Sequence, residues 1–121
     1  IGGTGKDKLQ GGDGDDLLIA GATDFDANDD ALYAVMKEWT SAHDYLTRVK
    51  NLRNGGGGGT DGPQNGTVFL VASPIAATVH DDAAADQLAG GNGRDWFFAR
   101  VDAAIKDMIG DLAAGEEKNL I

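Results

Sequence analysis

The sequence predicts a mainly β fold with an α insertion: a short parallel β-roll interrupted by two helices and a glycine-rich loop. A nine-residue pattern occurs in two tandem pairs, a stretch with helical periodicity separates the pairs, and 19 Gly but no Cys occur in 121 residues. We expect a single domain over residues 1–121, with repeats at 2–26 and 77–98, a helical and loop insertion at 27–76, and a C-terminal cap at 99–121.

The repeated pattern is Gly-Gly-x-Gly-x-Asp-x-apolar-x. It is complete at 2–10, 11–19 and 90–98, whereas 81–89 keeps only the Asp and the apolar position. Three glycines permit a tight turn with positive φ, and the three residues after the Asp favour a short strand whose middle side chain enters a core. Two such units would form one winding of a parallel β-roll.

The insertion has a different pattern. Apolar residues at helical spacing predict helices over 29–39 and 42–53, with Ser41 as the N-cap of the second helix and Asn54-Gly55 as its end. A mobile, glycine-rich loop is expected to follow. The β-branched runs at 67–72 and 76–80 predict strands. After residue 98 the apolar residues fit either a helix or an irregular last strand, and their spacing does not decide between the two.

The composition excludes several classes of function. The chain has 20 Asp+Glu against 10 Lys+Arg and a formal charge of −10, which argues against binding to nucleic acid or to anionic membrane surfaces. No apolar run is long enough to cross a bilayer, so membrane insertion is not expected. The absence of Cys excludes disulfides and cysteine zinc sites. A small chain rich in Gly and Asp needs another source of stability, and calcium (Ca²⁺) is the ion that suits oxygen ligands.

Stacked turns of this kind would bring carbonyl oxygens and Asp carboxylates together. Their repulsion favours a cation between them. Calcium accepts about 6–8 oxygens at irregular geometry, whereas magnesium requires a tighter octahedron. The turns therefore predict a calcium site that magnesium fills less well.

The repeats at 2–10, 11–19 and 90–98 resemble the RTX (repeat-in-toxin) motif, a calcium-binding repeat. The resemblance implies sixth-position ligands and assisting third-position residues: Asp7, Asp16, Asp86 and Asp95, with Asp13 and Asn92. It also implies core side chains at the apolar position: Leu9, Leu18, Leu88 and Phe97. Thr4 and Lys6 weaken the first turn, and non-glycine residues at 81, 82 and 84 weaken the turn before Asp86.

Two acidic residues directly after the second repeat are further candidates. Asp24 and Asp26 would either form a distorted third calcium turn or cap the following helix. Two ways of joining the repeats remain open. The favoured one places Asp16 with Asp86 on one flank, and the alternative pairs Asp7 with Asp86 and Asp16 with Asp95.

The remaining residues give no sign of an enzyme. His43 and His80 are the only histidines, and no serine or cysteine nucleophile lies in a recognisable motif. Trp96 and Phe98 flank the core position of the last repeat. They would either pack beneath the insertion or form an exposed surface for a polysaccharide.

The resulting functional hypothesis is a calcium-binding structural module that folds on calcium binding. The resemblance implies that it is part of a larger secreted bacterial protein, exported to the extracellular space through a C-terminal signal without a cleaved leader. The alternative is a calcium-stabilised carbohydrate-binding module that uses exposed aromatic side chains.

Overall fold

The computed structural model describes residues 1–121, and the chain divides into two compact units. Unit 1 consists of Ile1–Thr23 and Val79–Ile121, and unit 2 consists of Asp24–Thr78. Each unit is built from different secondary structure, so the two are described separately.

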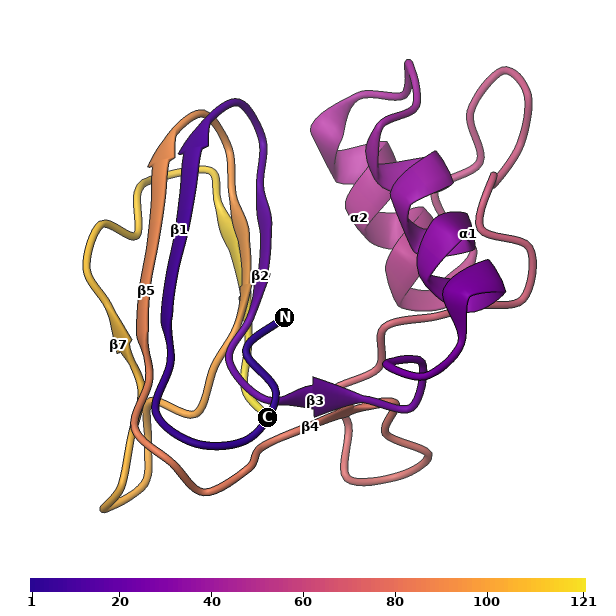
Figure 1. Ribbon diagram of the computed structural model, residues 1–121. Helices are drawn as coiled ribbons and strands as arrows, with labels where there is room; N and C mark the ends of the chain where they lie inside the picture. Colours follow the sequence, from indigo (N-terminus) through magenta and orange to yellow (C-terminus); the bar gives the residue numbers. More distant parts are fainter. The chain divides into compact units, whose positions relative to one another are not determined.

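Unit 1 contains three small sheets (Figure 1). The first is parallel in the order β1-β5-β7, with β1 (Lys8–Asp13), β5 (Gln87–Asn92) and β7 (Met108–Ile109). The second is parallel in the order β2-β6-β8, with β2 (Leu17–Ile19), β6 (Trp96–Phe98) and β8 (Glu117–Asn119). The third pairs β3 (Ala22–Thr23) antiparallel with β4 (Val79–His80).

The predicted fold class is therefore wrong. The structure is a small mixed fold of three separate sheets and two helices, and it forms neither a closed β-roll nor a solenoid. The physical reason is that the chain leaves the parallel sheets at β3 and returns only at β4, through an antiparallel pair. Each parallel sheet contains only three strands, and the longest strand has 6 residues.

The apolar position of the nine-residue pattern does form the core of unit 1. Leu18, Leu88 and Phe97 are 3%, 2% and 0% exposed and belong to one cluster, and Leu9 packs against it. Leu9 is paired with Leu88 across β1 and β5, and Leu18 with Phe97 across β2 and β6. The core residues expected from the pattern are confirmed.

The pairing of the repeats follows the alternative register, and the favoured one is wrong. Lys8 pairs with Gln87 and Leu17 with Trp96, which places Asp7 next to Asp86 and Asp16 next to Asp95. The turn at 81–86 lies beside the turn at 2–7, because the Gly5 N–H donates to the Asp82 carboxylate at 2.6 Å. Residues 24–78 therefore interrupt the repeats without changing the register in which the turns before them pair with the turns after them.

Unit 2 contains two helices, α1 (Asp29–Trp39) and α2 (Tyr45–Asn54), close to the predicted ranges. The N-cap of α2 is Asp44, whose side chain accepts from the Thr47 N–H, so the predicted Ser41 cap is wrong. The helix ends at Gly55 with φ 75°, as predicted, because a left-handed C-cap favours glycine.

No helix of the structure is both long and apolar enough to cross a membrane.

The strands expected at 67–72 are absent, and only Val79–His80 of the second run is a strand. The backbone groups of this segment bond elsewhere. The Leu70 N–H donates to the Leu52 carbonyl, and the Val71 N–H donates to the Thr78 hydroxyl. Since a helix end and a side chain satisfy these groups, no neighbouring strand is needed. After residue 98 the chain forms two short strands, β7 and β8, and no helix.

Candidate calcium-binding turns

The sixth-position aspartates of the turns line up in two columns. In the first column, the Asp7 N–H donates to Asp86 Oδ1 at 2.7 Å, and the Asp86 N–H donates to Asp107 Oδ1 at 3.0 Å. Asp86 and Asp107 are 2% and 4% exposed. The first column therefore contains three carboxylates from turns far apart in the sequence.

The second column is built in the same way. The Asp16 N–H donates to Asp95 Oδ1 at 2.7 Å, and the Asp95 N–H donates to Glu116 Oε1 at 3.4 Å. Asp95 is fully buried. The parallel strands fix both columns, because the pairing of β1 with β5 and of β2 with β6 aligns the residues that precede them.

The second oxygens of these carboxylates carry the strongest indication of a ligand. Oδ2 of Asp7, of Asp16 and of Asp86 is buried and has no hydrogen-bond partner. A buried charged oxygen without a partner destabilises the folded state, so each such atom calls for an explanation, and a cation supplies one.

The first glycine of a turn makes room for the carboxylate. A Cβ at Gly11 would lie 2.6 Å from Cγ of Asp16, and a Cβ at Gly2 would lie 3.0 Å from Oδ2 of Asp7. The contact at Gly11 is closer than real Cβ atoms come to other atoms, and the contact at Gly2 is tighter than most of theirs. The glycine therefore lets the Asp side chain fold back beneath its own turn, which keeps its second oxygen buried.

The electrostatics show that these carboxylates are under strain without a counter-ion. Burial, followed by the neighbouring Asp15, raises the pKa of Asp16. Burial, with the nearby carboxylates of Asp107, Asp82 and Asp7, raises the pKa of Asp86. Burial raises the pKa of Asp95 to about 6, with a further contribution from Glu116 and Asp16. In each case the environment disfavours the charged form that calcium needs.

More oxygens lie on the exposed side of the turns. Asn92 Nδ2 donates to Asp13 Oδ1 at 2.9 Å, so the third-position residues of two neighbouring turns lie in contact. The Arg94 N–H donates to Asp15 Oδ1, and the carboxylate of Asp111 accepts from the Gly90 and Gly91 N–H groups.

No group of three or more His, Asp or Glu side chains is arranged to hold one metal ion in this structure. A calcium site here would therefore combine one or two carboxylates of a column with backbone carbonyls and water, which are also ligands that calcium uses.

Two members of the columns were not found by sequence reasoning. Asp107 and Glu116 come from the segment expected only to cap the chain. A signal exists, because 102–110 and 111–119 are two further nine-residue units with an acidic residue at the sixth position, although residues 99–101 separate them from the repeat at 90–98. Neither copy carries the Gly-Gly pair, and Glu replaces Asp in the second, which hides the pattern.

Four predicted site residues are not members of the columns. Asp24 and Asp26 belong to unit 2 and are exposed in the segment before α1, where Asn28 is the residue that caps the helix. Trp96 and Phe98 are fully buried, and Trp96 Nε1 donates to Asn119 Oδ1 at 2.9 Å. They do not form the exposed aromatic surface considered for polysaccharide binding.

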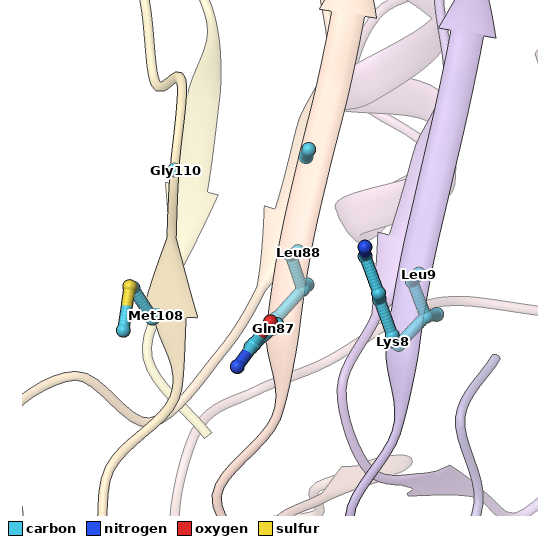
Figure 2. Close-up of a pocket in the computed structure, with 7 residues that line it drawn as sticks. Lys8, Leu9, Gln87, Leu88, Met108 and Gly110 are labelled. Carbon is cyan, nitrogen blue, oxygen red and sulfur yellow. The ribbon is translucent and has the colours of Figure 1, made fainter.

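A shallow pocket of about 140 Å³ crosses β1, β5 and β7 (Figure 2). Figure 2 shows Lys8, Gln87 and Met108 on three neighbouring strands, in agreement with their register. Leu9 and Leu88 also line this pocket, and its lining contains no carboxylate. The pocket therefore lacks the ligands of a calcium site.

Comparisons with models of known protein families, with curated proteins and with solved structures gave no significant match.

Proposed function

We propose that this chain is a calcium-binding module whose unit 1 becomes fully ordered when calcium neutralises its two carboxylate columns. The observation that carries the proposal is the set of buried, unpartnered oxygens: Oδ2 of Asp7, Asp16 and Asp86. The resemblance of the repeats to the RTX motif supports the same ion.

Calcium would stabilise the folded state of unit 1. Its charge offsets the desolvation that raises the pKa of Asp16, Asp86 and Asp95, and carboxylate ligation must displace any proton held there. Calcium is also preferred over magnesium, because carbonyls and mixed carboxylates at irregular positions suit its flexible coordination. Binding and ordering of unit 1 are then one coupled event.

The biological role follows from this coupling as part of the same proposal. Extracellular calcium modules have dissociation constants of about 10⁻⁴–10⁻³ M. With an affinity in that range, unit 1 would stay incompletely ordered where calcium is scarce and become ordered outside the cell. This supports a structural, non-enzymatic module of a larger secreted bacterial protein.

The test is a calcium titration of the full chain, followed by isothermal titration calorimetry and circular dichroism, with magnesium in a parallel arm. We expect heat of binding together with a gain of β signal in calcium, and a much weaker response in magnesium. Asp16→Asn and Asp86→Asn should each reduce the calcium affinity at least tenfold. Asp102→Asn removes an exposed carboxylate of the same unit and is the matched control.

An equal response of Asp102→Asn and Asp86→Asn would show that calcium acts only through the overall negative charge. No heat and no spectral change at millimolar calcium would contradict the proposed function.

A further inference from the structure

Unit 2 contains a buried carboxylate that the calcium argument does not use. Glu38 is fully buried at the end of α1. Its Oε1 lies 2.9 Å from His43 Nδ1 and accepts from Asn51 Nδ2 at 2.9 Å, and its Oε2 accepts from the Gln64 N–H at 2.6 Å. Three donors from three segments therefore converge on one side chain.

These donors determine the state of the histidine. Burial by itself would raise the pKa of Glu38, but the hydrogen bonds from Gln64, His43 and Asn51 outweigh burial and hold the pKa below its usual value. Glu38 is thus a carboxylate and only accepts hydrogen bonds. His43 Nδ1 is therefore the donor in this contact, so in the tautomer that the contact selects Nε2 is the acceptor atom of the ring.

His43 lies beside a pocket. The His43 side chain is only 10% exposed, and the structure gives Nε2 no hydrogen-bond partner. The ring borders a pocket of about 290 Å³. Gly59, with φ +102°, lies directly against Nε2, where any Cβ would collide with the ring. A nearly buried histidine, held at Nδ1 by Glu38, therefore forms part of the pocket wall.

Most residues of the lining carry a polar or charged group. Ala42 is its apolar member, and the others are charged or carry hydroxyl or amide groups: Lys37, Ser41, His43, Thr60, Asp61 and Gln64. The Asp61 carboxylate and the Nε2 lone pair repel an anion, and the Lys37 ammonium repels a cation. Glu38 cannot serve as a metal ligand without losing its three donors.

We propose that this pocket binds a neutral polyhydroxylated ligand of monosaccharide size, with His43 Nε2 as the central acceptor of a ligand hydroxyl. The lining combines acceptors at His43 and Asp61 with hydroxyl groups at Ser41 and Thr60, which suits a ligand whose every hydroxyl both donates and accepts. The volume is at the small end of ligand pockets, so one sugar ring is the appropriate size. The inference concerns unit 2 and does not depend on calcium.

The test uses the full chain and free glucose, galactose and mannose as probes, each titrated to high millimolar concentration. Long-range ¹H–¹⁵N spectra report the Nε2 of both histidines. We expect a saturable shift of the His43 Nε2 signal for at least one hexose, with a millimolar dissociation constant, and no shift for His80. Asp61→Asn, at an exposed residue that does not contact Glu38, should weaken binding several-fold. His43→Phe should weaken it at least tenfold.

If His43→Phe unfolds unit 2, the hexose affinity of Asp61→Asn tests the proposal instead, since it is measured on a folded chain. His80→Gln is the control and should bind as the wild type does. The proposal is overturned if no hexose shifts His43 Nε2, or if His80 shifts equally. It is also overturned if inorganic phosphate or zinc chloride shifts Nε2 while the hexoses do not.

Discussion

Glu38 in unit 2 and Asp86 in unit 1 are both buried, at 0% and 2% exposed. The surroundings of Glu38 stabilise its negative charge, whereas those of Asp86 destabilise it. Glu38 accepts from three donors, and its pKa is held below the usual value. Asp86 leaves Oδ2 without a donor and has other carboxylates as neighbours, and its pKa is raised.

The two units differ in how they accommodate buried carboxylates. Unit 2 satisfies Glu38 with its own donors, and its unpartnered buried oxygens are the neutral amide Oδ1 atoms of Asn51 and Asn65, whereas unit 1 leaves carboxylate oxygens without a partner. We therefore expect an external cation to be part of the folded state of unit 1 and to be irrelevant to unit 2.

Calcium should stabilise unit 1 strongly and leave unit 2 unchanged. At a calcium concentration about 100-fold above the dissociation constant, one site adds ~2.7 kcal/mol, which corresponds to roughly 10–20 °C for a unit of this size. Amide hydrogen exchange resolved by residue measures both units in one sample. Equal protection of unit 1 in chelator and in millimolar calcium would remove the contrast.

Glu38→Ala should destabilise unit 2 by about 3 kcal/mol, because it leaves the donors of His43, Asn51 and Gln64 buried without an acceptor. Glu38→Gln keeps one acceptor oxygen and should cost less. Urea unfolding monitored at residues of unit 2 measures the loss. The calcium response of unit 1 is the internal control, and a change in it would show that the units are not independent in this respect.

The two units should depend on pH in opposite directions when calcium is chelated. A raised pKa in the folded state means that Asp95, with a pKa of about 6, binds its proton more tightly when folded. Asp95 therefore adds to the free energy of unfolding of unit 1 at acid pH, on the order of 2 kcal/mol. This stabilisation is lost as the pH rises toward 6. The lowered pKa of Glu38 stabilises unit 2 above the usual Glu range, and this contribution is lost as the pH falls through the folded value.

Thermal unfolding from pH 4 to 7, again resolved by unit, checks this prediction. In calcium the trend of unit 1 should reverse, because protons compete with the ion for the same carboxylates. Parallel trends in both units under chelation would contradict the assignment of strained carboxylates to unit 1.

Asp86→Asn should have opposite effects with and without calcium. In chelator it removes a desolvated charge while keeping an acceptor for the Asp7 N–H, so we expect a rise of a few degrees, on the order of 1 kcal/mol. In calcium it removes a ligand and should abolish most of the gain. Differential scanning calorimetry of Asp86→Asn beside Asp102→Asn compares the two conditions, and destabilisation in both would point to a packing role alone.

The smallest expected difference is between two turns. Asp16→Ala should reduce calcium affinity several-fold more than Asp7→Ala, because the turn at 11–16 also contains Asp13 and Asp15, whereas the turn at 2–7 contains Lys6. Calorimetric titration of both variants gives the two affinities. Equal losses would mean that the extra acidic residues do not contribute to binding.

Much of the local structure follows from residues close in the sequence. Helix positions, the Gly55 end of α2 and the core residues Leu18, Leu88 and Phe97 depend on spacing and on turn chemistry, which are local properties. The Asp44 cap was missed because Ser41 and Asp44 both fit the capping pattern, and only the direction of the chain after α1 selects between them.

By itself, the sequence determined the nine-residue pattern, the acidic residue at its sixth position and the two helices of unit 2, because each is encoded within a few neighbouring residues. Only the tertiary structure decided the fold class, the pairing of Asp7 with Asp86 and of Asp16 with Asp95, and the burial of Trp96 and Phe98. It alone brought Glu38 to His43, Asn51 and Gln64. These features depend on contacts between segments up to 79 residues apart. The free energy of such contacts depends on which distant segments meet, and neighbouring residues in the sequence do not determine that.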